Sequence, residues 1–569
     1  MCRSAALSAR LASGRWLTVV TGLAAAAPVI AATLRALHDG WMPVGDQGII
    51  ATRAYDVFSS HMPLLGQYSE ASVSAGHAIY SPGPMLYWLL ALPAYSGVTA
   101  TLTLTIATMN CAAIVGSVAL ARRRGGLALM LAAAIAVALL SRSFSPESLH
   151  DLFNPSAALF PLVLLIFLCW SLACGEYRLL PLTALVASFV AQAHLAYVAP
   201  VAGALAVGLV GLALSRTRLA RLATPPAAGR RSLLVWSLAA VAVTLVCWSA
   251  PIADQIEHHP GNLSLIAQRA TASGPTQGAQ KGRWALERAV GVPPRWLRSP
   301  TRGSGQLALV SGGDYGDTRL SDVSQAPSAG QTGSAIALLA ALLVVIALAA
   351  WRRRGDLVAG AAIAVVLCVA LVEDVAKTPI TASNTLGYSI WWGSIVGMWA
   401  WLILGWSAWS LLTETVPRGW RLRVPAMARA LGLAAVAAVA TALALGQGAD
   451  THAPYYRPLS AVAGALDRAI PPQTTVGLVQ RGGVAVPIEP AIRYTLRIHG
   501  VRALGAFASR RPGAWYELDH RRVNSWVSVN GDRPSRFRPA RVVARAVLTD
   551  PQGSHRVTAT LSPPRAVRV

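Results

Sequence analysis

The chain has 569 residues, of which 54% are hydrophobic and 13% are charged, and its mean hydropathy is +0.49. This composition excludes a soluble globular protein and a disordered one, and it indicates a polytopic membrane protein. The formal net charge of +25 comes almost entirely from arginine clusters between apolar segments. Such clusters indicate membrane orientation and contact with anionic lipids, so we expect membrane lipids and no nucleic acid as partners.

Windows of about 20 apolar residues predict about eleven membrane-spanning helices. They lie near residues 16–37, 99–121, 127–141, 155–173, 179–195, 197–215, 232–252, 334–351, 356–374, 390–412 and 430–447. With the N-terminus inside, eleven spans place the arginine clusters at 122–124, 216–231, 352–354 and 418–429 in the cytoplasm, as the positive-inside rule requires. Every histidine then lies at or beyond the outer face.

The first outer loop, residues 38–98, carries an unusual density of ionisable side chains. It closes with PMLYWLLALP at 84–93, which is apolar but too short to span a core about 30 Å thick at about 1.5 Å per residue. We therefore expect a short helix on or in the outer face. The alternative is the first half of a longer span that runs on through Thr99.

The other large outer segments differ in character. The loop at 253–333 has a helix-like patch at 283–290 and a Gly- and Ser-rich tail from 299 on that is typical of a flexible loop. From 448 to 569, alternating hydrophobicity at 475–479 and 541–548 flanks a helix-like stretch at 490–499. We therefore expect a transmembrane domain at 1–447 and a small extracytoplasmic α/β domain at 448–569.

Several motifs carry a family resemblance. An acidic GDQG turn follows the first apolar segment, DVFSSHMPLLGQYS and SPGPMLYWLLALP follow in the outer loop, and NPSAALFPLVLLIFL opens a later span. Together they resemble the GT-C class of integral-membrane glycosyltransferases, which includes protein O-mannosyltransferases, lipid A aminoarabinose transferases and mycobacterial-type arabinosyltransferases. More narrowly, the chain is similar to a group of actinobacterial membrane proteins of that architecture. The resemblance covers residues 16–215 well and the later spans by general plan.

The resemblance implies a GT-C-like fold and a hexosyl- or pentosyltransferase. Such an enzyme takes a sugar from a polyprenyl-phosphate carrier and passes it to a hydroxyl of a cell-wall glycan, glycolipid or protein outside the membrane. This chemistry requires a carboxylate that removes the acceptor proton and cations that stabilise the departing phosphate.

Three acids are candidates for catalysis. Asp46 lies just after the first span, where the class has its general base, although an equally good interpretation is a cap for a helix at 47–60. Asp56 follows Arg53 by three residues, which favours an ion pair over catalysis. Asp151 stands one turn before Asn154, which occupies the place where many relatives have a second acid.

Further polar residues near the outer face are candidates for binding. The candidates for the donor phosphate are Arg53, Arg142 and Lys377. The candidates for substrate contact are Glu70, His77, His150, Asn154, Gln192 and His194. Glu70 and His77 resemble the metal ligands of some relatives, which leaves a divalent cation possible, but they form no compact ligand motif and we assign no metal ligand. For His194, a buried ring satisfied by a carbonyl is an equal alternative.

Two other classes of function compete with the transferase. A transporter or flippase for lipid-linked sugars is expected to show paired repeats and polar breaks at mid-membrane, whereas this chain concentrates its charge at the outer face. A non-catalytic scaffold of the cell envelope would not need the carboxylate-bearing first loop. Both remain alternatives from the sequence.

Overall fold

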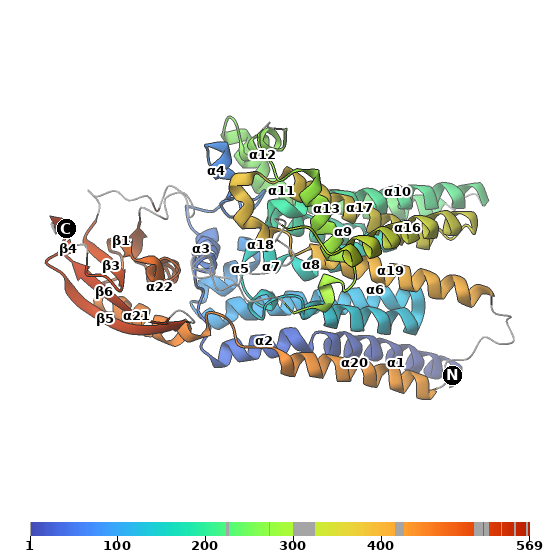
Figure 1. Ribbon diagram of the computed structural model, residues 1–569, viewed down its shortest axis with the longest axis horizontal. Helices are drawn as coiled ribbons and strands as arrows, with labels where there is room; N and C mark the ends of the chain where they lie inside the picture. The colour runs from blue at the N-terminus through green and yellow to red at the C-terminus, as the bar shows by residue number, and fades with distance from the viewer. Residues whose placement is uncertain are drawn as a thin grey trace.

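The computed structural model is an elongated molecule made of a helical bundle and a smaller domain with a β-sheet (Figure 1). The N-terminus lies at the far end of the bundle, and the C-terminus lies in the sheet domain at the opposite end of the molecule. The structure describes residues 2–222, 227–271, 274–299, 325–415, 426–505, 516, 523–535, 537–550, 553–564 and 567–568. Most of the loop tail predicted to be flexible therefore lies outside the described residues.

The bundle contains most of the helices. They are α1 (Cys2–Ala25), α2 (Ala27–His38), α3 (Asp46–Tyr55), α4 (Ala71–Ala75), α5 (Met85–Tyr95), α6 (Thr99–Ser141), α7 (Asn154–Ala157), α8 (Leu159–Ala173), α9 (Leu180–Ala193), α10 (Val198–Leu222), α11 (Ala227–Glu257), α12 (Asn262–Thr271), α13 (Gly278–Val290), α16 (Ala329–Trp351), α17 (Gly355–Lys377), α18 (Leu386–Ser389), α19 (Gly393–Thr415) and α20 (Ala426–Gly446).

Among the described residues, seven helices are long and apolar enough to cross a membrane, and the bent pair of α1 and α2 makes an eighth. The chain is therefore a multi-pass membrane protein. All eleven predicted segments are helical, but those at 179–195 and 430–447 form shorter helices, and those at 99–121 and 127–141 both fall within α6. The count of eleven spans stays a prediction.

The long helix α6 reverses direction at a pair of glycines. Gly125 and Gly126 have non-helical dihedral angles, and the side chain of Asn110 donates a hydrogen bond of 2.9 Å to the carbonyl of Leu149. In a straight helix, Asn110 would be about 47 Å from Ser141, and the eight residues from Ser141 to Leu149 reach at most about 29 Å. The two halves of α6 are therefore antiparallel, as expected for two separate segments.

Arginine clusters gather at the bundle end that lies away from the sheet domain. Arg124, at the break in α6, pairs with Glu176, which follows α8. Trp170 near the end of α8 donates a hydrogen bond of 2.7 Å to the carbonyl of Asp356, and Arg354 pairs with the Asp356 side chain at 2.8 Å. The connections at 122–126, 174–179 and 352–354 therefore lie together. We call this the arginine end, and we call the opposite end of the bundle the domain end.

The predicted short helix in the first outer loop is confirmed as α5. It covers 11 residues and is too short to cross the membrane. A turn through Gly97, which has a φ of 71°, separates it from α6, so the alternative of one span running through Thr99 is wrong. α5 packs against α3 and α6 at the domain end.

The sheet domain contains α21 (Ala453–Ala469), α22 (Glu489–Ile498) and the strands β1 (Thr475–Arg481), β2 (Arg502–Leu504), β3 (Ser525–Gly531), β4 (Phe537–Arg538), β5 (Arg541–Asp550), β6 (Gly553–Ser562) and β7 (Val567–Arg568). The main sheet has the order β2-β1-β3-β6-β5. β1 runs parallel to β2 and β3, and the remaining pairs are antiparallel. The predicted α/β composition of this region is thus present, with strands and a helix at the expected positions.

Candidate functional site

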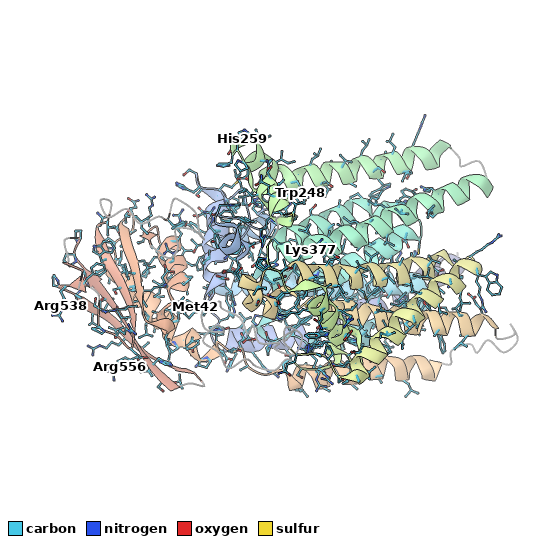
Figure 2. All side chains as sticks on the ribbon, turned by 45° about the horizontal axis from the view of Figure 1, so that its top comes forward. Met42, Trp248, His259, Lys377, Arg538 and Arg556 are labelled. Carbon is cyan, nitrogen blue, oxygen red and sulfur yellow. The ribbon has the colours of Figure 1, made fainter. Side chains whose placement is uncertain are left out.

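Asp46 begins α3 at the junction between the bundle and the sheet domain, where Met42 is labelled in Figure 2. The residue before the helix is Gly45, whose φ of 60° is a conformation that glycine adopts without steric cost. The Gly45 amide donates a hydrogen bond of 2.7 Å to the carbonyl of Pro487 in the sheet domain. α3 has no side-chain cap, so the predicted capping role of Asp46 is wrong. Asp46 is the first residue of the helix, one position after the cap residue Gly45, and it is half-buried.

Asp46 and Arg53 lie on one face of α3, because seven residues make two helical turns, about 10 Å. Both act on the buried Tyr87 of α5. Burial raises the pKa of Tyr87 above its ordinary value, the nearby Arg53 lowers it, and the nearby Asp46 raises it. Tyr87 donates a hydrogen bond of 3.1 Å to the side-chain oxygen of Gln67. Asp46 and Arg53 of α3 therefore lie near enough to Tyr87 for their charges to act on it.

Tyr87 also lines a small cavity. Its lining includes Gln67 from the first loop, Asn154 at the start of α7 and Gln192 near the end of α9. Its volume of about 10 Å³ is about the space of one water molecule. Two of the residues that the sequence predicted for substrate contact, Asn154 and Gln192, thus meet in one place.

Gln192 presents an unsatisfied oxygen in this cavity. Its amide nitrogen donates a hydrogen bond of 2.8 Å to the carbonyl of Cys247, whereas its buried Oε1 atom has no hydrogen-bond partner among the described residues. Oε1 lies so close to Gly83 that a Cβ on that glycine would be 2.1 Å away. Buried polar atoms in native proteins are almost always paired, so this oxygen is suited to accept a hydrogen bond from a bound group.

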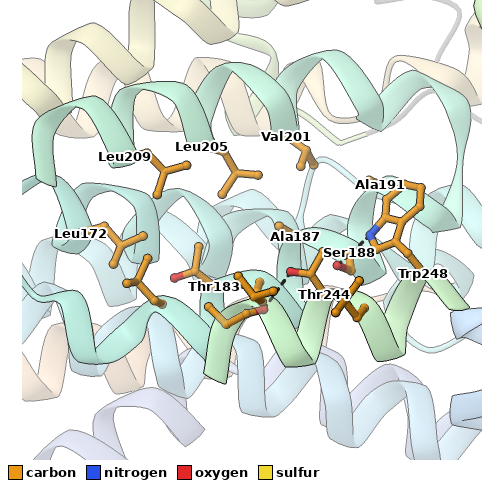
Figure 3. Close-up of a pocket in the computed structure, with 15 residues that line it drawn as sticks. Leu172, Thr183, Ala187, Ser188, Ala191, Val201, Leu205, Leu209, Thr244 and Trp248 are labelled. Atoms are coloured by element: carbon orange, nitrogen blue, oxygen red, sulfur yellow. Dashed lines mark hydrogen bonds between the residues drawn. The ribbon is translucent and has the colours of Figure 1, made fainter. Parts of the chain in front are cut away.

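An apolar groove of about 370 Å³ lies between α9, α10 and α11 (Figure 3). Val201, Leu205 and Leu209 of α10 follow one another along one wall, and Trp248 of α11 stands at one end. Trp248 donates a hydrogen bond of 3.1 Å to Ser188 on α9. A second groove of about 420 Å³ shares Leu209 with the first and continues toward the arginine end.

The groove of Figure 3 ends beside the small cavity. Its lining includes Ala191, which precedes Gln192, and Trp248, which follows the Cys247 that accepts the Gln192 hydrogen bond. One end of the apolar groove therefore lies next to the helix positions that carry the polar residues of the small cavity.

Asp56 is fully buried and held by three groups. Arg53 lies 3.3 Å away, Arg497 of α22 lies 3.0 Å away, and the Tyr516 hydroxyl donates a hydrogen bond of 2.7 Å to it. Arg497 also lies over the ring of Tyr55 at 5.0 Å. These contacts join α3 to the sheet domain, and they favour the ion-pair interpretation of Asp56 over a catalytic one.

The loop at 142–153, between α6 and α7, forms a buried polar cluster with the start of the sheet domain. The His150 Nε2 atom lies 3.2 Å from Asp450, and the hydroxyl of Tyr456 donates a hydrogen bond of 2.8 Å to the same carboxylate. Burial lowers the pKa of His150 and the Asp450 charge raises it, with a net upward shift. Asp151 accepts a hydrogen bond from Ser156, and burial raises the pKa of Asp151 to about 8.

Glu147 belongs to the same cluster. One carboxylate oxygen accepts a hydrogen bond from the Thr451 amide, and the other has no partner among the described residues. Burial, and then the charge of Asp450, raise the pKa of Glu147 to about 7. Burial therefore favours the protonated form of these carboxyl groups where the bundle meets the sheet domain.

The remaining predicted phosphate ligands lie at the surface. The exposed Arg142 donates a hydrogen bond of 3.0 Å to Ser299. Lys377 lies on the bundle at the end of α17 (Figure 2), where it pairs with Glu373 at 2.6 Å and is 71% exposed. Neither contact brings these cations to the residues around Tyr87.

The three other candidates for substrate contact lie apart from one another. Glu70 is half-buried before the short α4, and His77 is exposed. His194 is half-buried between α9 and α10, and its ring lies 6.0 Å from that of Tyr388. Burial lowers the pKa of His194 to about 4. Within the described residues, no group of three His, Cys, Asp or Glu side chains is placed to hold a metal ion.

Sequence reasoning missed several members of the site. The sequence places Tyr87 in a short apolar surface helix, and no motif marks Gln67 or Asp450 as a site residue. For Asp450 a signal existed, since it is an acid just beyond the last apolar segment. Tyr87 gave none, because an aromatic side chain at the head of a short apolar helix also suits the headgroup level.

Comparisons with known proteins give a weak likeness to a solved structure. No protein-family model and no curated protein matches the chain. Among solved structures, the crystal structure of ArnT from Cupriavidus metallidurans bound to undecaprenyl phosphate is similar over 95% of this chain and 97% of its own, with 15% sequence identity and a TM-score of 0.44. This likeness is too low to transfer an activity to this chain.

Proposed function

We propose that the protein is a membrane glycosyltransferase of the GT-C type that moves a sugar from a polyprenyl-phosphate carrier to an acceptor hydroxyl. The observation that carries the proposal is the apolar groove between α9, α10 and α11, which ends beside the unsatisfied oxygen of Gln192. A polyprenyl tail is apolar and stays in the bilayer, so a groove on the membrane side suits it. The sugar phosphate then reaches the polar residues at the domain end.

Asp46 is the general base of this proposal. Its carboxylate takes the proton of the acceptor hydroxyl while that oxygen attacks the anomeric carbon of the donor sugar. The bond between this carbon and the phosphate oxygen breaks, and the lipid phosphate leaves with the bonding electron pair. A single displacement of this kind inverts the anomeric centre. Asp46 suits this role because it is half-buried and faces α5 together with a cation.

Arg53 is the candidate for the leaving phosphate. Its NH1 group contacts Asp56, and a guanidinium has five N–H donors, so the Asp56 contact orients it and leaves donors for a phosphate. Stabilising charge that develops in the transition state is commonly the largest catalytic contribution. Gln192 and Asn154 line one cavity with room for about one water molecule, so a sugar must widen this cavity before their amide groups can hydrogen-bond its hydroxyls.

The acceptor belongs to the side of the membrane that holds the sheet domain. The arginine clusters at 122–124 and 352–354 lie at the other end of the bundle, and the positive-inside rule favours the cytoplasm for that end. The proposed acceptor is therefore a hydroxyl of an extracytoplasmic glycan, glycolipid or protein.

The test is transfer from a polyprenyl-phosphate-linked hexose or pentose by the full-length protein in nanodiscs. For Asp46→Asn we expect a rate about 10² to 10⁴ lower, because an amide does not accept the proton. Asp532→Asn is the matched control, since this exposed carboxylate pairs with His555 on the sheet domain and should leave the rate unchanged. A folded Asp46→Asn protein of normal activity would remove Asp46 as the base. A wild-type protein that transfers none of these sugars would overturn the assignment itself.

A further inference from the structure

A third apolar groove, distinct from the two described above, opens between α10 and α17 toward the arginine end. The two helices nearly touch at Gly203, where a Cβ would lie 2.4 Å from the Val366 side chain. Beyond this crossing they line a groove of about 700 Å³ that includes Ala206 and Ser215 on α10. Nine residues of helix cover about 14 Å, which is close to half of a hydrocarbon core about 30 Å thick. The groove therefore has the depth of one leaflet.

The walls of this groove face lipid. Val210 and Leu214 of α10 line it and are 58% and 54% exposed. Small side chains such as Ala359 and Ala362 of α17 form the opposite wall and keep it open. Because the groove lies within the apolar length of both helices, bilayer lipid is the solvent that reaches it.

The mouth of the groove carries one arginine, Arg353, and one carboxylate, Asp356, which pairs with Arg354. Arg352 and Arg354 on either side pair with Glu414, and Arg354 also pairs with Asp356. Arg353 lines the groove, is exposed, and has no ion pair among the described residues. Anionic lipid headgroups are attracted to such basic residues at the membrane surface.

We propose that this groove binds one acyl chain of an anionic phospholipid from the leaflet at the arginine end, with the lipid phosphate at Arg353. The groove has the depth of one leaflet, its walls are apolar, and its mouth holds an arginine without an ion pair among the described residues. The site is separate from the groove of Figure 3 and does not depend on the proposed transferase activity.

The test uses delipidated full-length protein with palmitoyl-oleoyl phosphatidylglycerol or the phosphatidylcholine with the same chains as probes. Native mass spectrometry counts the bound lipid, and thermal unfolding follows the stabilisation that binding produces. We expect the wild-type protein to retain phosphatidylglycerol in preference to phosphatidylcholine. One arginine near the membrane surface contributes about 1 kcal/mol, so Arg353→Gln should weaken phosphatidylglycerol binding about five-fold and leave phosphatidylcholine binding unchanged.

A pair of substitutions on α10 tests the location. Ala206→Phe fills the narrow end of the groove and should abolish binding of one lipid, whereas Ala202→Phe, one turn away at an exposed position that does not line the groove, should retain it. If the Ala206→Phe protein does not fold, the variant Ala362→Leu, which narrows the groove from α17, is used in its place.

Three lipid-binding outcomes would overturn the proposed site. They are equal retention of both lipids by the wild-type protein, Arg353→Gln with unchanged selectivity, and groove-filling variants that bind as the wild-type protein does. A wild-type dimer that Ala206→Phe dissociates would likewise overturn it, because the occupant of the groove would then be a second copy of the chain.

Discussion

The hydroxyl of Tyr516 donates a hydrogen bond of 2.7 Å to the carboxylate of Asp56, 460 positions earlier in the chain. Asp56 is 0% exposed, and its other partners are Arg53 and Arg497. This contact fastens the sheet domain to α3, the helix that begins with Asp46.

Removing this hydrogen bond should loosen the sheet domain. Because the acceptor is a buried charge, Tyr516→Phe should lower the free energy of unfolding by about 1.5–3 kcal/mol. The matched control is Tyr494→Phe, since the Tyr494 hydroxyl also crosses to the bundle but donates to the neutral carbonyl of Ala94 at 3.1 Å. A neutral acceptor predicts a loss of about 0.5–1.5 kcal/mol. Denaturant titration compares the two variants, and equal losses would contradict the charged role of Asp56.

Blocking the groove of Figure 3 should impair use of the lipid donor. Ala184 on α9 lines this groove, and its exposed neighbour Leu185 does not. Under the proposed function, Ala184→Trp should raise the KM for a long polyprenyl donor much more than for a donor with a short tail, because only the long tail needs the groove. Leu185→Trp should leave both values unchanged. A KM that rises equally for both donors would place the tail elsewhere.

The buried carboxyl groups of the loop at 142–153 predict that the stability of the folded state falls as pH rises. The pKa values of Glu147 and Asp151 are raised to about 7 and about 8, so the folded state holds their protons where the unfolded chain has released them. Their contribution is complete below the ordinary carboxyl pKa of about 4 and is lost as pH rises through the two raised values. The raised pKa of His150 acts in the same direction.

Thermal unfolding measured between about pH 5 and about pH 9 tests this dependence. The melting temperature of the wild-type protein should decrease over this range, and the double variant Glu147→Gln with Asp151→Asn should show a flatter profile. Glu373→Gln removes an exposed carboxylate and should keep the wild-type slope. Parallel profiles for the double variant and the wild-type protein would show that these groups are not protonated in the folded state.

The orientation can be tested by labelling single cysteines in a variant without the six native ones. The structure offers exposed positions at both ends, His77 and Arg556 at the domain end and Arg352 at the arginine end. An impermeant thiol reagent should label His77→Cys and Arg556→Cys in intact cells, and it should label Arg352→Cys only after lysis. The reverse pattern would place the candidate site in the cytoplasm.

Local patterns were enough to predict the long apolar helices, whereas α12 and α21 were not predicted. Apolar windows located each of the eleven segments, and the glycines at 125 and 126 lie between two of them, where α6 turns back. Charge was equally informative, because arginines between segments gather at one end of a bundle whenever the segments alternate in direction. The lengths of α9 and α20 were less predictable, since helix ends depend on neighbouring helices that a window does not include.

The candidate site was only partly predictable. Asn154 and Gln192 stood out as polar groups at the ends of apolar segments, and they line one cavity. The pairing of His150 with Asp450 joins residues 300 positions apart, and such a contact leaves no local pattern in the chain. The capping role expected for Asp46 failed for a related reason: the residue before α3 is fixed by a hydrogen bond to Pro487 in the sheet domain.

That hydrogen bond also sets an order of events in biosynthesis. Gly45 leaves the ribosome long before Pro487, and α3 packs so tightly on α22 that a Cβ at Gly48 would lie 2.5 Å from the backbone of Pro490. A nascent chain whose first helices have already entered the membrane still lacks the surface that holds Asp46 in place. The first loop must therefore wait for the sheet domain to be synthesised and folded, and until then the candidate site of an inserted bundle is incomplete.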